Sequence, residues 1–145
     1  MAKILVVDDV ENVRYSLRLV LENAGHEVFE AENGIYAENL LRDHAFDLVI
    51  TDIIMPDKEG MELIMDINEM YPATKVIAIT GGGRTNSPVA LRGSEEIMGI
   101  EASGPSQIYL EAAGMLGAHD TLIKPFDTAR LMASVDQCLA LDQNA

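Results

Sequence analysis

Four short apolar segments of this chain each run directly into a polar or charged residue. The segments cover residues 4–7, 48–51, 76–79 and 122–123. Short apolar segments rich in β-branched residues are typical of strands that are buried on both faces of a parallel sheet. Stretches with helical spacing separate them, which is the pattern of repeated βαβ units. The sequence therefore predicts an α/β fold built on a parallel sheet.

A fifth strand is expected at residues 28–31, where Glu30 interrupts the apolar run. The interruption favours a position at one edge of the sheet. The last strand begins with His119, Asp120 and Thr121, and this polarity favours the opposite edge. Five strands alternating with five helices account for the chain and predict a single domain over residues 1–145, without an effector domain.

Helical spacing also predicts where the helices begin, end and pack. Gly25 is placed to end the first helix, Asn33-Gly34 turns the chain into the second, and Asp127 can cap the last. The third helix carries Met61, Ile64 and Met65, which we expect to pack in the core. The buried stripe predicted for the last helix consists of Leu131, Val135, Cys138 and Leu139.

The connection after the fourth strand is longer than a crossover requires. Residues 81–123 separate Thr80 from Lys124, whereas two loops, a helix and a strand need about 25 residues. The surplus lies in 81–105, which is rich in glycine, and a regular helix resumes at 106–116. We expect 81–105 to form a long Gly-rich insertion between the fourth strand and the fourth helix.

The charge balance excludes several classes of partner. The 145 residues carry a formal net charge of −14, which argues against binding to nucleic acid or to an anionic membrane. No apolar run reaches the length of about 18 residues that a membrane span needs, and no signal peptide is recognisable. Cys138 is the only cysteine, which fits a reducing compartment. We expect a cytoplasmic protein that is a monomer or a weak dimer.

The polar residues at the strand ends can form one chemical site. In open α/β sheets, ligands bind beyond the carboxyl ends of the strands, so Asp8, Asp9, Asp52, Thr80 and Lys124 should converge there. Neighbouring carboxylates repel one another unless a hard cation lies among them, and Mg²⁺ prefers such oxygen ligands. An aspartate can also become an acyl phosphate. The pattern therefore indicates a Mg²⁺-dependent phosphoryl-transfer site.

The same residues carry a family resemblance. The motifs are Asp8-Asp9, Asp52-Ile53-Ile54-Met55-Pro56, the loop through Gly60, Thr80-Gly81 and Lys124-Pro125-Phe126. In this order, and at strand ends, they resemble the receiver domain of two-component response regulators. The resemblance covers nearly the whole chain and implies a flavodoxin-like sheet with strand order 2-1-3-4-5.

The resemblance implies a role for each residue of the site. Asp52 would accept the phosphoryl group from a sensor histidine kinase or a phosphotransfer protein. Asp9, Asp52 and the backbone carbonyl of Ile54 would hold Mg²⁺, with Asp8 acting partly through water. Lys124 would pair with the phosphoryl group, and Thr80 would move toward it as the switch. The output would be contact with a protein target, which the sequence does not identify.

Three positions depart from the usual pattern of the family. Thr121 replaces the aromatic residue that usually accompanies the switch hydroxyl. Ile54 and Gly82 occupy two positions that often tune dephosphorylation, and neither side chain can hold an attacking water. We therefore expect slow dephosphorylation and a switch that does not use the family's aromatic rotamer.

Two other function classes compete with this interpretation. A pseudo-receiver, a binding module without phosphate turnover, is disfavoured by the intact Asp52, Thr80 and Lys124. A phosphohydrolase with a nucleophilic aspartate would need two aspartates separated by one residue on the first strand, whereas Asp8 and Asp9 are adjacent. His26, His44 and His119 are expected to be exposed residues rather than phosphate carriers.

Overall fold

The computed structural model describes residues 1–53, 60–80, 114, 117–124 and 126–141. In chain order its helices and strands are β1 (Lys3–Val7), α1 (Glu11–Asn23), β2 (Glu27–Ala31), α2 (Gly34–Asp43), β3 (Leu48–Asp52), α3 (Gly60–Met70), β4 (Lys75–Thr80), β5 (Asp120–Ile123) and α6 (Thr128–Ala140). The expected insertion at 81–105 lies outside the described residues, and so does the expected helix at 106–116 except for residue 114.

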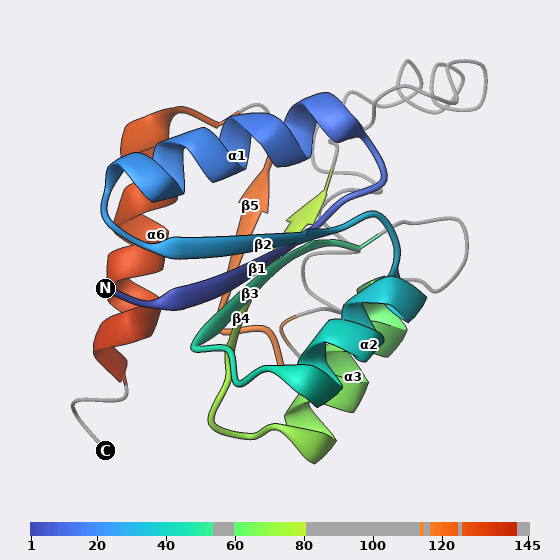
Figure 1. Ribbon diagram of the computed structural model, residues 1–145. Coiled ribbons are helices and arrows are strands. Elements are labelled where there is room, and N and C mark those ends of the chain that lie inside the picture. Colours follow the sequence, from blue (N-terminus) through green and yellow to red (C-terminus); the bar gives the residue numbers. More distant parts are fainter. Residues whose placement is uncertain (54–59, 81–113, 115–116, 125, 142–145) are drawn as a thin grey trace, which may run out of the picture.

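The five strands form one parallel sheet in the order β2-β1-β3-β4-β5 (Figure 1). This order confirms the flavodoxin-like topology expected from the resemblance. The strand that contains Glu30 is at one edge, and the strand that begins with Asp120 is at the other. The strands β1, β3 and β4 lie between them and are buried along almost their whole length.

Helices cover both faces of the sheet. Helices α1 and α6 lie on one face, and α2 and α3 lie on the other (Figure 1). Alternate residues of each central strand point to opposite faces, so that Ile4 and Val6 join one core while Leu5 and Val7 join the other. The two cores explain why the middle of each central strand is apolar on both faces.

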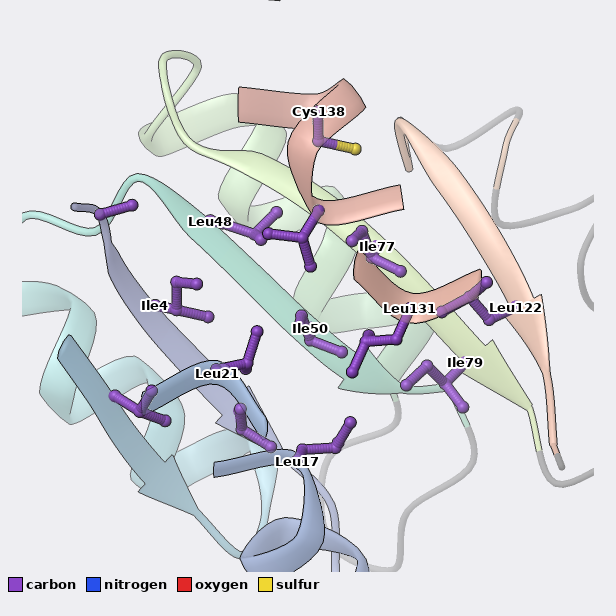
Figure 2. Packing of buried hydrophobic residues seen from close by; sticks show 14 residues of the cluster. Ile4, Leu17, Leu21, Leu48, Ile50, Ile77, Ile79, Leu122, Leu131 and Cys138 are labelled. Carbon is purple, nitrogen blue, oxygen red and sulfur yellow. The ribbon is translucent and has the colours of Figure 1, made fainter. Parts of the chain in front are cut away.

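The core beneath α1 and α6 shows how the helical stripes meet the sheet (Figure 2). Leu17 and Leu21 of α1 and Leu131 of α6 pack against strand residues such as Ile4 and Ile50. The stripe predicted for the last helix is confirmed, because Leu131, Val135 and Cys138 are buried and Leu139 packs against them.

The predicted helix ends are also confirmed. The Asn33 side chain accepts a hydrogen bond from the backbone N–H of Tyr36, and Asp127 accepts one from the N–H of Arg130. These contacts satisfy backbone donors that the first turn of a helix leaves unpaired. Gly25 follows α1 at φ 97°, a conformation that glycine adopts without the steric cost of a Cβ atom.

The packing predicted for the third helix is wrong at one position. The buried residues of α3 are Gly60, Leu63, Ile64 and Ile67, whereas Met65 is 49% exposed. Positions 60, 63, 64 and 67 follow helical spacing and form one stripe. Met65 is one residue beyond Ile64, about 100° around the helix, so its side chain points toward solvent.

The expectation about the histidines needs correction as well. His26 and His44 are half-buried, and only His119 is exposed. The Nδ1 atom of His26 accepts a hydrogen bond from the N–H of Ala2, and that of His119 accepts one from the N–H of Val76. These contacts lie where β1 and β4 begin, so the rings support the end of the sheet opposite the aspartates.

Among the described residues, no helix is both long and apolar enough to cross a membrane.

Candidate metal and phosphoryl-acceptor site

The sheet register brings the polar strand ends together. Val7 is paired with Thr51, Asp52 with Ile79, and Thr80 with Ile123. The ladder continues one step beyond the strands, because the N–H of Lys124 donates to the carbonyl of Thr80 at 2.9 Å. The predicted convergence of functional residues at the carboxyl edge of the sheet is therefore a consequence of the register of four strands, β1, β3, β4 and β5.

Three carboxylates form a cluster at this edge. Asp8, Asp9 and Asp52 each offer an oxygen atom within 4.8 Å of the others. Asp8 is 1% exposed and Asp52 is 7% exposed, whereas Asp9 faces solvent. The cluster thus has two buried members that the sheet positions and one accessible member that lies on the turn after β1.

Lys124 bridges the two buried carboxylates. Its Nζ atom is 3.0 Å from Oδ2 of Asp8 and 3.3 Å from Oδ2 of Asp52. The lysine comes from the end of β5, whereas the aspartates come from β1 and β3. Three carboxylates and one ammonium leave a formal charge of −2 in the cluster.

Asp8 has both carboxylate oxygens in use. Oδ2 contacts Lys124, and Oδ1 accepts a hydrogen bond from the N–H of Val10 at 2.9 Å. The second contact folds the carboxylate back over its own turn, as aspartates do in Asx turns. Asp9 has no such contact with the described residues and is the member best placed to bind a ligand from solvent.

Gly60 packs directly against the strand end that carries Asp52. A Cβ atom at position 60 would lie 2.1 Å from the carbonyl oxygen of Asp52 and 2.4 Å from Cα of Ile53. The N–H of Gly60 also donates to the carbonyl of Ile53 at 3.0 Å. The first turn of α3 therefore approaches the Asp52 backbone so closely that only glycine fits.

Thr80 is 2% exposed at the end of β4, next to the strand that carries Lys124. Thr121 is half-buried on β5 and pairs with Ala78, two residues before Thr80. Ile54, Gly81, Gly82 and Pro125 lie outside the described residues, so the expected carbonyl ligand and the tuning positions stay predictions.

The donor set fits a magnesium ion. Mg²⁺ is a hard cation that takes oxygen ligands, usually one or two carboxylates together with water and substrate oxygens. The cluster supplies carboxylate oxygens only, and its formal charge of −2 matches one divalent cation. Asp9 is the accessible candidate ligand and Asp52 is the buried candidate that the resemblance implies, whereas both carboxylate oxygens of Asp8 are engaged by Lys124 and the Val10 N–H.

Sequence reasoning missed two residues beside this site, Arg14 and Glu30. The Arg14 guanidinium donates to the backbone carbonyl of Asp8 and to the Glu30 carboxylate. The sequence did contain a signal for these contacts. Arg14 and Arg18 lie one turn apart on a predicted helix, where their like charges repel unless an acidic side chain lies near both. Glu30, on the strand predicted at one edge of the sheet, is that acidic side chain.

Cys138 is a core residue, as expected. Burial is the main reason why the pKa of its thiol is raised to about 11. A thiol with that pKa carries almost no thiolate at neutral pH and is a poor nucleophile. Asp52 lies at the carboxyl edge of the sheet, whereas Cys138 is buried in the core beneath α6. Of these two residues, Asp52 is therefore the candidate for covalent chemistry.

The fold and the site define a signalling module of the response regulator type. Residues 4–96 match the sequence profile of the response regulator receiver domain. This match spans more than half of the chain, and the chain therefore belongs to that family. Membership disfavours the phosphohydrolase alternative, which rested on a different arrangement of aspartates.

Individual relatives agree with this assignment. The response regulator receiver protein CpdR of Brucella abortus (strain 2308) is 38% identical over 81 residues, which are 56% of this chain and 68% of that protein. Protein CcdB of Bacillus subtilis (strain 168) is 31% identical, with 96% of this chain and 98% of CcdB covered. The chemotaxis protein CheY of the same organism is 29% identical, with 94% and 97% covered.

Solved structures show the same architecture. The response regulator TrrA of Thermotoga maritima, in complex with Mg²⁺ and BeF, is 29% identical with a TM-score of 0.69, covering 95% of this chain and 99% of that one. A CheY-like receiver domain protein of Methanospirillum hungatei JF-1 has a TM-score of 0.77 over 99% and 98% of the two chains. Its identity of 24% supports the fold alone.

Proposed function

We propose that this chain is a response regulator that accepts a phosphoryl group on Asp52 from a phosphohistidine of a sensor kinase or a phosphotransfer protein. The observation that carries the proposal is the Lys124 ammonium between the buried carboxylates of Asp8 and Asp52, with Asp9 beside them. Family membership supports the same reaction.

In the proposed step, a carboxylate oxygen of Asp52 attacks the phosphorus atom of the phosphohistidine. An O–P bond forms, the N–P bond breaks, and the imidazole nitrogen leaves with the electron pair of that bond and takes a proton from water. Such a transfer depends more on positioning and on charge neutralisation than on covalent help from the protein. The buried position of Asp52 at the end of β3 orients the attacking oxygen.

The remaining residues of the site neutralise and read out the new charge. Asp9 and Asp52, together with the expected carbonyl of Ile54, would hold Mg²⁺, which would supply positive charge for the phosphoryl oxygens. Lys124 exchanges part of its contact with Asp52 for a contact with the phosphoryl group. Thr80, on the neighbouring strand, is proposed to turn its hydroxyl toward the phosphoryl group and so to report its presence.

We propose that the chain acts as a stand-alone regulator in the cytoplasm, with protein contact as its output. The proposal follows the example of CheY and CcdB, which match this chain over 97% and 98% of their own length. A partner bound only in the phosphorylated state and onward transfer in a phosphorelay are the two forms that this output can take. Rapid return of the phosphoryl group to a histidine protein would identify the relay form.

Acetyl phosphate and Mg²⁺ provide a direct test. Intact-mass spectrometry should show one added phosphoryl group on the wild type and on Asp43→Asn, an exposed position at the end of α2. Asp52→Asn should show none. Labelling of Asp52→Asn would contradict the assignment of the acceptor, and absence of labelling in the wild type would favour the pseudo-receiver.

A further inference from the structure

We infer that Arg14 is a positioning residue for the metal site, which it serves by holding the peptide group between Asp8 and Asp9. The inference rests on the proposed function, since it concerns Mg²⁺ binding at that site. Arg14 lies on α1 and contributes no ligand atom. It acts through the backbone from which Asp9 projects.

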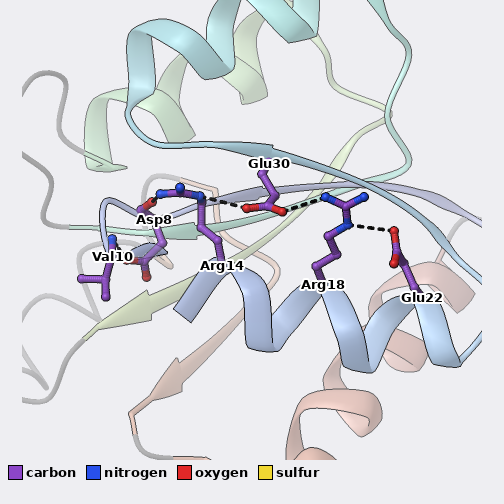
Figure 3. Close-up of polar contacts among 6 residues, drawn as sticks. All are labelled: Asp8, Val10, Arg14, Arg18, Glu22 and Glu30. Atoms are coloured by element: carbon purple, nitrogen blue, oxygen red, sulfur yellow. Dashed lines mark hydrogen bonds and ion pairs between the residues drawn. The ribbon is translucent and has the colours of Figure 1, made fainter. Parts of the chain in front are cut away.

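The contacts of Arg14 form a bridge between two elements (Figure 3). Its NH1 group donates to the carbonyl oxygen of Asp8 at 2.8 Å, and its Nε group donates to Oε1 of Glu30 at 3.0 Å. The side chain is only 14% exposed. A planar guanidinium with two such contacts has little freedom to rotate, which makes it a rigid support for the carbonyl.

The carbonyl that Arg14 holds belongs to the peptide plane that continues into Asp9. The carboxylates of Asp8 and Asp52 are fixed by Lys124, and that of Asp8 also by the Val10 N–H. The Asp9 side chain has no hydrogen bond or ion pair with the described residues. Its direction therefore depends on the backbone, and Arg14 is the side chain that holds that backbone from the α1 side.

Glu30 keeps the guanidinium in place and is itself held by a second arginine. NH1 of Arg18 donates to the other carboxylate oxygen of Glu30 at 2.9 Å, and Nε of Arg18 donates to Glu22 at 2.9 Å (Figure 3). Burial raises the pKa of Glu30, but the hydrogen bonds from Arg18 and Arg14 outweigh this effect and lower it below its ordinary value. Glu30 therefore stays ionised at neutral pH and anchors Arg14.

Arg18 provides a matched control for this inference. It lies on the same helix, carries the same charge and shares the Glu30 contact, but no contact joins it to Asp8. Loss of either arginine removes one positive charge near an acidic site, which by itself would favour Mg²⁺ binding. Weaker binding in an Arg14 variant would therefore have a geometric cause and not an electrostatic one.

The test compares Arg14→Met with Arg18→Met in the full chain. The Mg²⁺ dissociation constant is measured by isothermal titration calorimetry without a phosphodonor, at a temperature where both variants are folded by circular dichroism. Loss of residues that orient a metal ligand commonly weakens binding by 10-fold or more, so we expect about a 10-fold increase for Arg14→Met. Arg18→Met should stay within about twofold of the wild type. Both variants should unfold at a lower temperature, because both lose the Glu30 contact.

Equal dissociation constants for the two variants, or an unchanged constant for Arg14→Met, would overturn the inference while leaving the proposed function intact. A wild type that binds no Mg²⁺ would instead contradict the proposed function. If Arg14→Met does not fold, Arg14→Lys is compared with Arg18→Lys. A lysine lacks the fork that spans both acceptors, so Arg14→Lys should again be the weaker Mg²⁺ binder of the pair.

Discussion

Removing the Lys124 ammonium should destabilise the metal-free protein strongly. In Lys124→Met, the carboxylates of Asp8 and Asp52 lose the cation that lies 3.0 and 3.3 Å from them. At an effective dielectric constant of about 20, each of these pairs attracts by about 5 kcal/mol. Desolvation of the ions offsets much of the attraction, and loss of one partner of a buried pair costs about 3–5 kcal/mol. We expect a loss of that size in the free energy of unfolding.

Urea denaturation at pH 7 in the presence of EDTA, followed by far-ultraviolet circular dichroism, measures this loss. Saturating Mg²⁺ should recover part of it, because a ligand that binds only the folded state stabilises that state. The recovery should be larger for Lys124→Met than for the wild type, since the formal charge of the cluster changes from −2 to −3.

A second substitution shows whether the buried charge is the cause. Asp8→Asn removes one carboxylate while its amide oxygen can still accept from the Val10 N–H. The double variant Asp8→Asn/Lys124→Met should therefore be more stable than Lys124→Met alone. A loss below about 1 kcal/mol for Lys124→Met, or a double variant no more stable than the single one, would refute the reasoning.

Three further predictions concern Gly60, Glu30 and Ile54. Gly60→Ala should destabilise the protein by about 3 kcal/mol and slow its labelling by acetyl phosphate, because the added Cβ atom meets the Asp52 carbonyl. The control is Gly25→Ala, at φ 97° with open space around it, which should lower the stability by about 1–2 kcal/mol and leave labelling unchanged. The lowered pKa of Glu30 stabilises the fold at pH values above the ordinary pKa of a glutamate, and this contribution is lost as the pH falls through the lower pKa of the folded state. The difference in stability between the wild type and Glu30→Gln should therefore shrink as the pH falls below the ordinary pKa of a glutamate. Ile54→Asn should shorten the lifetime of the aspartyl-phosphate, measured by phosphate release, because its amide can position a water; an unchanged lifetime would contradict the tuning argument.

Much of the architecture could be predicted because it is encoded locally. Alternation of apolar runs with helical spacing is visible in any short window, and Gly25, Asn33 and Asp127 act on the turns beside them. The parallel direction of the strands then places their polar ends at one edge. These features determined the fold class and the set of candidate site residues. The strand order came from the family motifs, since hydrophobic patterns alone do not order strands.

The exposure of individual residues was less predictable. Met65 is apolar and lies beside the buried Ile64, but it lies outside the stripe of α3 that packs in the core and is exposed. His44 is polar and was expected to be exposed to solvent, yet it is half-buried, and the centroid of its ring lies 4.6 Å from the ring centroid of Phe29. In both cases the environment of the side chain depends on elements that lie far away in the chain.

The sequence by itself determined which chemical groups this protein brings to the carboxyl edge of its sheet, because strand ends are local features and parallel strands end together. The tertiary structure decided how those groups are paired. Lys124 meets Asp8 across 116 residues, and Arg14 joins the Asp8 carbonyl to Glu30 on another strand. Ion pairs and hydrogen bonds act over about 3 Å, so only the packed register of strands and helices selects among the many pairs that the sequence allows.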